Sequence, residues 1–205
     1  MNLRRIAHSI VTRLLLFGIA LVLFGSAVRY FVLTNFIRED LGAVVESQQL
    51  ALASYIAHDV DYKILERQSL LRRMAEKLPL ELLQQPDRLS AWLGERHDLR
   101  PLFSQGLFVT NMDGLALANY PRLIRLAGEN YGDRDYIRAA LAGDLSVGRP
   151  LIGRMAKVPL LPIAVPVKDS PGQVRAVLAG VTELSAPGFL DLLQKSRIGE
   201  SGGFC

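Results

Sequence analysis

Hydrophobic residues near the N-terminus form an uninterrupted run, Leu14–Val28, which holds fifteen residues and no charge. Beyond one basic residue, Arg29, the apolar run continues to Leu33. A helix rises ~1.5 Å per residue, so this stretch covers roughly the 30 Å hydrocarbon core of a bilayer. Arg29 lies near one end, where a long side chain keeps its charge in the headgroup layer. The pattern predicts a transmembrane helix, which we place at residues 14–37.

The charges around this run predict its orientation. No acidic residue precedes it, but three basic residues do: Arg4, Arg5 and Arg13. Basic flanks stay in the cytoplasm, so we expect a cytoplasmic tail at 1–13 and an exported remainder. A cleaved signal peptide, with Gly25-Ser26-Ala27 as the cleavage site, is an alternative. A buried core helix of a soluble protein is a more distant one.

A second periodic pattern follows the apolar run. Between residues 38 and 78 proline is absent, and apolar residues recur at spacings of three and four. This predicts one long stalk helix, 38–79, that ends or kinks at Pro79. Such a helix suits a stalk that pairs with a second copy of the chain in a homodimer. Alternatively, its apolar stripe packs on its own domain, and the two arrangements are compatible. The stripe comprises Leu41, Val44, Val45, Leu52, Tyr55, Ile56, Val60, Ile64, Leu71, Met74 and Leu78.

Further along, the pattern changes from helical to alternating. Residues 80–99 predict one or two short helices, with Trp92 and Leu93 in the core. Two strand-like runs, Leu107–Thr110 and Leu115–Asn119, flank an Asp-Gly turn, which is a strong hairpin signal.

The C-terminal third adds a short helix and two more strands. Asp133 can cap a helix over Arg134–Ala142. The segment Leu160–Val167 lies among three prolines and predicts an edge or interrupted strand, and Val174–Val181 predicts another strand. A helix is expected over Pro187–Lys195. Together the elements predict an α+β fold.

Net charge narrows the function classes. Five basic residues and no acidic residue lie in 1–38, so the rest of the chain has a net charge of about −1, although the whole chain carries +4. That outer part lacks the basic excess of a nucleic-acid-binding protein. The only cysteine is Cys205, which excludes an internal disulfide.

The sequence contains few motifs that indicate catalysis or metal binding. The pattern Gly199-Glu200-Ser201-Gly202-Gly203 matches the Gly-x-Ser-x-Gly nucleophile motif, but only two residues follow it. The histidine and acid that an α/β-hydrolase places after its serine are therefore missing. We expect a glycine turn that opens a strand, and keep a serine hydrolase only as a remote alternative. Three scattered histidines predict no metal site, and no cofactor is expected.

The most informative stretch runs from Tyr131 to Ala140. A helix N-terminus offers partial positive charge and free N–H groups, and Arg134 adds a planar fork that matches a carboxylate. Tyr136 and Tyr131 can close over a small ligand. In the other interpretation, Arg134 pairs with Asp133 or a nearby strand, and Tyr136 is a core residue. The residues alone leave both open.

Several segments resemble, in family order, the membrane-distal module of a double Cache (dCache) sensor domain. They are Asp133–Tyr136, Gly153, Ile163–Val167, Gly172 and Val177–Gly180. The resemblance implies a PAS-like sheet with short flanking helices at 80–197, and the truncated start of a membrane-proximal module at 198–205. It is strongest to the sensor half of membrane diguanylate cyclases, and also covers histidine kinases and chemoreceptors.

The resemblance also implies a ligand pocket. Amino-acid-binding members carry an Arg-x-Trp-Tyr-x-Asp run, in which Arg134 matches the arginine and Tyr136 replaces the tryptophan. Ile137 and Ala139 stand where tyrosine and aspartate would, and neither Val181 nor Thr182 is an acid. The groups that hold an α-ammonium are absent, whereas Arg134 can hold a carboxylate.

The resulting hypothesis is a non-enzymatic sensor in the inner membrane, single-pass, with its C-terminal part in the periplasm. Its small-molecule ligand would lie against Arg134, Tyr136, Tyr131 and Tyr120. The alternative is a truncated remnant, without an output domain, that only dimerises through the long helix. We also expect Ile198–Phe204 to be poorly ordered, because its partner strands are not encoded.

Overall fold

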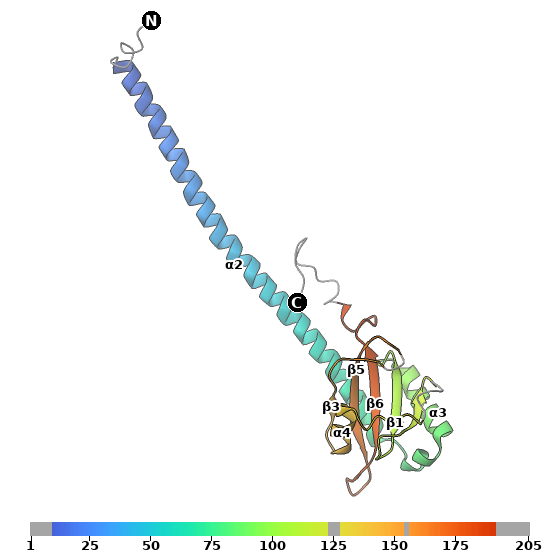
Figure 1. The fold of residues 1–205 in the computed structure, drawn as a ribbon. Helices are drawn as coiled ribbons and strands as arrows, with labels where there is room; N and C mark the ends of the chain where they lie inside the picture. The colour runs from blue at the N-terminus through green and yellow to red at the C-terminus, as the bar shows by residue number, and fades with distance from the viewer. Residues whose placement is uncertain (1–9, 123–127, 154–155, 192–205) are drawn as a thin grey trace. The chain divides into compact units, whose positions relative to one another are not determined.

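The computed structural model describes residues 10–122, 128–153 and 156–191 (Figure 1). The chain divides into two compact units, Met1–Tyr55 and Ile56–Cys205. Helix α2, Ile10–Glu76, begins in the first unit and ends in the second. The strand expected over Gly199–Phe204, with Ser201 in it, and the disorder expected there lie outside the described residues.

The first unit contains the apolar run. Within α2, Arg13–Val32 is long and apolar enough to cross a membrane, with a mean hydropathy of 2.0, and none of it is buried inside the chain. Large side chains such as Phe17 and Phe24 are 67% and 72% exposed. A core helix of a soluble protein would be mostly buried, so this alternative does not describe the structure.

The second unit is built on one antiparallel sheet. Its strand order is β2-β1-β6-β5-β3, and β4 also pairs with β5. The strands are β1 (Gly106–Thr110), β2 (Ala116–Tyr120), β3 (Ser146–Val147), β4 (Leu151–Ile152), β5 (Pro159–Lys168) and β6 (Val174–Glu183). The predicted α+β fold is confirmed, and the Asp-Gly hairpin joins β1 to β2 with Gly114 at a φ of +79°.

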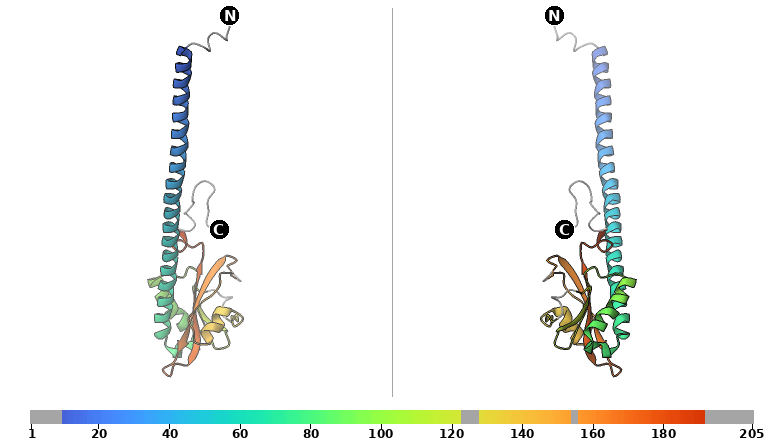
Figure 2. Two further views of the ribbon diagram at one scale, coloured as in Figure 1. Left: turned by 90° about the vertical axis from the view of Figure 1, so that its left-hand side faces the viewer. Right: turned by 90° about the vertical axis from the view of Figure 1, so that its right-hand side faces the viewer.

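Helices cover both faces of this sheet (Figure 2). One face packs against the end of α2 and against α3 (Pro86–Leu99), which a short 3₁₀ helix, η1 (Leu80–Gln84), precedes. The other face packs against α4 (Asp135–Leu141). Neighbouring strand residues point to opposite faces, so the odd residues Val177, Ala179 and Val181 face α4.

The helix α4 begins one residue later than the sequence predicts. Arg134, not Asp133, is its N-cap residue, with extended backbone angles (φ −81°, ψ 134°) and no side-chain cap. Asp135, in the first turn, takes the role instead, since its Oδ1 accepts a hydrogen bond from the backbone N of Tyr136 at 2.7 Å. The prediction of Asp133 as the cap was therefore wrong.

The proline-rich segment forms a continuous strand, β5, rather than an edge or interrupted one. It pairs along its whole length with β6. The carbonyl of Pro162 accepts a hydrogen bond from Gly148 N at 2.9 Å, so its backbone faces β3. Pro166, four residues on, faces the same way. The N–H groups missing at Pro162 and Pro166 thus fall on the side where only two-residue strands pair. Pro159, whose carbonyl accepts from Leu184 N, faces β6 but is the first residue of the strand.

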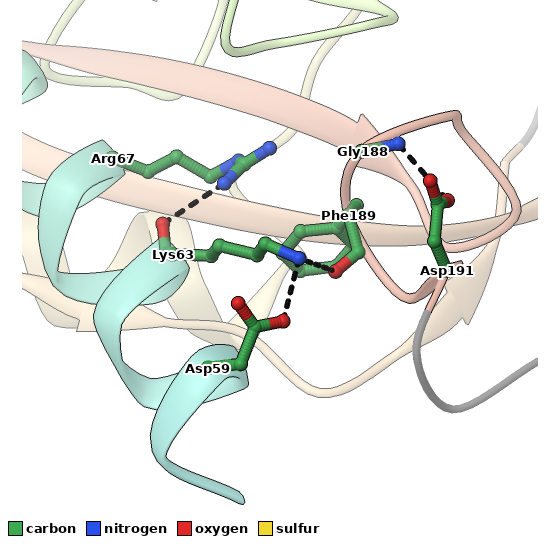
Figure 3. Close-up of polar contacts among 6 residues, drawn as sticks. All are labelled: Asp59, Lys63, Arg67, Gly188, Phe189 and Asp191. Atoms are coloured by element: carbon green, nitrogen blue, oxygen red, sulfur yellow. Dashed lines mark hydrogen bonds and ion pairs between the residues drawn. The ribbon is translucent and has the colours of Figure 1, made fainter. Parts of the chain in front are cut away.

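Of the helix expected over Pro187–Lys195, residues Pro187–Leu190 form a turn, Asp191 is helical, and the remainder lies outside the described residues. Figure 3 shows how this turn is held against α2. Lys63 Nζ donates to Asp59 Oδ2 at 2.6 Å and to the carbonyl of Phe189 at 3.0 Å.

Arg67 joins the same region to the sheet. It is 6% exposed, and its Nε donates to Leu102 O at 3.0 Å and to Thr182 Oγ1 at 3.2 Å. Its Nη1 donates to the carbonyl of Lys63 at 2.9 Å, and its guanidinium lies 4.4 Å from the centroid of the Phe189 ring. Burial lowers the pKa of Arg67, against an opposing effect of Glu66. Arg67 therefore ties α2 to β6 and to the turn after it.

Candidate functional site

A cavity of about 290 Å³ opens beside the face of the sheet that carries α4. It brings together all four residues that the sequence singled out, Tyr120, Tyr131, Arg134 and Tyr136. The remaining lining residues are Gln105, Leu107, Phe108, Asn119, Pro121, Leu151, Gly153, Ala156, Leu160, Pro162 and Val181. The walls thus come from five strands and from the segment that leads into α4.

Arg134 is the one charged residue in this lining, as far as the structure describes it. Its Nε lies 3.9 Å from Asp133 Oδ1, and the Asp133 side chain is 58% exposed. An ion pair so long and so well hydrated contributes little. The Arg134 side chain is itself 24% exposed, so this charged lining residue is partly desolvated, and a guanidinium in such a position can give an anion a charge-assisted hydrogen bond.

Tyr131 and Tyr136 are both cavity walls and core residues. They are 9% and 4% exposed, and the ring of Tyr131 packs at 5.0 Å from that of Phe108. Tyr136 lies so close to Gly148 that a Cβ there would be 3.0 Å from its Cδ1. Their rings are therefore fixed, and the cavity is largely shaped before any ligand enters.

Tyr120 lines the cavity, but its hydroxyl group is bonded to α3. Its ring lies over Gly94 of α3, and its hydroxyl donates to Asp98 at 3.0 and 2.9 Å from the two carboxylate oxygens. This hydrogen bond, together with burial, raises the pKa of Tyr120. The hydroxyl thus serves α3, and Asp98 does not line the cavity.

A Tyr120→Phe variant tests that assignment. We expect a ligand of the cavity to bind it within about twofold of the wild type, because the deleted hydroxyl is directed at Asp98. Isothermal titration calorimetry would measure the affinity. A loss of tenfold or more would mean that this hydroxyl reaches the ligand after all.

Two polar lining residues, Gln105 and Asn119, carried no sequence signal. Gln105 Nε2 donates to Glu183 Oε2 at 3.1 Å, and Asn119 Nδ2 donates to the carbonyl of Pro121 at 2.7 Å. Both amides are therefore held in place, with their NH₂ groups already bonded. Asn119 is 5% exposed within a strand, where a polar residue that faces inward is only recognisable once the strand's register is known.

The described lining of the cavity holds few groups with acid–base or metal-binding chemistry. Among the described residues, no group of three or more histidine, cysteine, aspartate or glutamate side chains could hold a metal ion. The lining combines one guanidinium, fixed aromatic rings and aliphatic side chains. Such a cavity can bind and orient a small anion.

Comparison with known proteins relates this architecture to receptors. No protein-family model and no curated protein matches the sequence. Solved structures do, among them the Escherichia coli DcuS sensor domain, at 21% identity and a TM-score of 0.51 over 62% of this chain and 93% of that one. The chain has the fold of Cache sensor domains.

Two further Cache structures match over a larger part of the chain. The sensor domain of the Vibrio cholerae histidine kinase DctB has 16% identity and a TM-score of 0.60, with 68% of this chain and 56% of that one covered. The ligand-binding domain of the Campylobacter jejuni chemoreceptor Tlp3, in complex with 4-methylisoleucine, has 15% identity and a TM-score of 0.61, with 73% and 62% covered. The chain thus spans little more than half the length of these two domains.

Proposed function

We propose that the chain is the ligand-sensing part of a single-pass receptor of the inner membrane, with its Cache module in the periplasm. The observation that carries the proposal is the cavity, in which Arg134 is the one charged group of the described lining. A guanidinium at such a place pairs with a carboxylate through two parallel hydrogen bonds. The Tlp3 domain holds 4-methylisoleucine, which carries a carboxylate, and this supports a small organic acid as the ligand class.

The route from the cavity to α2 runs through one strand. Val181 of β6 lines the cavity, and the next residue, Thr182, faces the opposite side of the sheet and accepts a hydrogen bond from Arg67. Arg67 belongs to α2. A ligand that moves β6 by contact with Val181 would therefore shift the position of Arg67, and with it the helix. Ligand binding would thus be coupled to a change in the position of the helix, as in receptors that switch between two states.

The receptor would be anchored in the membrane and would pair with a second copy of the chain. Arg13–Val32 would be the anchor, retained rather than cleaved. Tyr62 and Leu65 are 67% and 58% exposed on α2, where they make no part of the described core. Exposed apolar residues three positions apart on one helix suit a homodimer contact. A protein that only dimerises would show this contact without any ligand effect.

The experiment is a thermal-shift screen of small carboxylates on the full chain in mild detergent. At a hundred times its Kd, a ligand stabilises by ~2.7 kcal/mol, which raises the Tm by about 5–10 °C in a chain of this size. Arg134→Ala removes the anion's partner, so we expect its affinity to fall by about 10- to 100-fold. Arg138→Ala is the matched control, because Arg138 lies on the same helix, is exposed and does not line the cavity.

Two outcomes would refute the assignment of the cavity. In the first, no carboxylate stabilises the wild type. In the second, a carboxylate stabilises Arg134→Ala as much as it stabilises Arg138→Ala, which would place its binding elsewhere.

A further inference from the structure

We infer that the ligand is a carboxylate without an amine, with an uncharged and mostly apolar tail, so that free amino acids are rejected. The inference rests on the proposed function, since it takes Arg134 as the partner of the ligand's carboxylate. It goes further because it assigns the chemistry of the rest of the molecule. Three features of the cavity carry it: its charges, the engagement of the acids around it and its walls.

The charges of the cavity are of one sign. The described lining contains one arginine and no aspartate or glutamate. The two internal stretches that the structure leaves undescribed, 123–127 and 154–155, contain no acid either, and each contains an arginine in the sequence. A desolvated ammonium is stabilised best by a carboxylate partner. The described lining offers an amino acid no carboxylate for its α-ammonium.

The acids nearest to the lining are already engaged. Glu183 accepts hydrogen bonds on both carboxylate oxygens, one from Gln105 Nε2 and one from the hydroxyl of Ser185. Asp135 Oδ1 accepts from the backbone N of Tyr136. Asp133 is turned to Arg134 and to solvent. An ammonium that recruited Glu183 or Asp135 would share a carboxylate that already holds the cavity or the start of α4.

The walls suit an apolar tail. Away from Arg134 the ligand would meet six apolar residues: Leu107, Phe108, Leu151, Leu160, Pro162 and Val181. Apolar ligand surface that leaves water against these side chains strengthens binding through the hydrophobic effect. The volume of 290 Å³ has room for roughly ten water-sized groups. A small aliphatic or aromatic acid fills this space, whereas a second carboxylate would meet these walls unpaired.

The neutral amides explain which polar substituent is tolerated. The NH₂ groups of Gln105 and Asn119 are bonded to Glu183 and to the carbonyl of Pro121. One N–H of each amide is thus in use, and the amide oxygen can accept a hydrogen bond from a ligand. A hydroxyl on the ligand can donate to such an oxygen at no cost in charge. A 2-hydroxy acid should consequently bind where the 2-amino acid of the same shape does not.

The test compares matched pairs on the full chain by calorimetry. Each pair shares one carbon skeleton: acetate and glycine, 4-methylpentanoate and L-leucine, 3-phenylpropanoate and L-phenylalanine, with 2-hydroxy-4-methylpentanoate and succinate added. We expect a branched or aromatic acid to bind at least tenfold tighter than its amino acid, and the hydroxy acid to bind like the plain acid. The same ligands on Arg134→Ala and Arg138→Ala show whether binding uses Arg134.

The outcomes separate this inference from the proposed function. If an amino acid binds as tightly as its deaminated partner, and still depends on Arg134, the inference fails and the proposed function stands. If succinate binds best, the apolar tail is refuted. If no member of any pair binds, or if Arg134→Ala binds the ligands as tightly as Arg138→Ala, the proposed function is wrong, and so is the inference that rests on it.

Discussion

Replacing Arg67 with alanine is expected to lower the free energy of unfolding by about 3 kcal/mol. The side chain is 6% exposed and donates hydrogen bonds to Leu102, Thr182 and Lys63. Truncation removes these charge-assisted bonds and the stacking on Phe189, and it leaves a cavity where the guanidinium was. The loss of several favourable contacts outweighs the desolvation that the buried charge no longer incurs.

Urea denaturation in mild detergent, followed by the fluorescence of Trp92, would measure this effect. Trp92 is the only tryptophan, and it is 9% exposed in the core between α3 and the sheet. Arg73→Ala is the matched control, since Arg73 is exposed on the same helix, and it should change stability by no more than about 0.5 kcal/mol. If Arg67→Ala loses less than twice what the control loses, Arg67 does not hold α2 to β6.

Arg67 also shows what the sequence could not reveal. The sequence left open whether the apolar stripe packs on its own domain or on a second copy, and Leu71, Met74 and Leu78 do pack in the core. The stripe itself could be recognised because helical spacing is a local property of the chain. Arg67 looked like an ordinary polar residue of that helix. Its partner Thr182 lies 115 residues further on, and nothing local in either segment indicates that the two meet.

The residues of the candidate site likewise include some that the sequence could single out and some that it could not. Arg134, Tyr131 and Tyr136 could be singled out because they lie next to one helix start, and the cavity does contain all three. Gln105 and Asn119 line it too, but only the register of β1, β2 and β6 brings them there. The sequence also could not predict in which direction the side chains of these residues point. The ligand-binding role of these residues is still a proposal that the experiments above are designed to decide.

The wrong prediction for the proline-rich strand has a simple physical cause. A proline pattern indicates that backbone donors are missing, but not on which side of the strand. Pro162 and Pro166 face the side of β3 and β4, so β5 keeps its pairing with β6.

Replacing Gly106 with alanine is expected to destabilise the second unit by about 4 kcal/mol. Gly106 has a φ of +90°, where a side chain is strained. In addition, a Cβ there would lie 2.0 Å from the carbonyl oxygen of Tyr120 and 2.6 Å from Cδ of Pro121. Backbone atoms cannot swing aside as a flexible side chain does, so β1 and β2 would have to separate at this point.

The effect should reach the cavity, because its neighbours Gln105, Leu107, Tyr120 and Pro121 all line it. Gly172→Ala is a close control: its φ is +86°, and nothing lies within 4 Å of the added Cβ. It therefore carries the backbone strain without the clash, and we expect it to lose only about 1 kcal/mol and to leave ligand affinity unchanged. Urea denaturation and calorimetry on both variants separate the effect of backbone strain from the effect of the clash. Equal losses would show that the β1–β2 hairpin opens without cost, and that Gly106 does not fix this wall of the cavity.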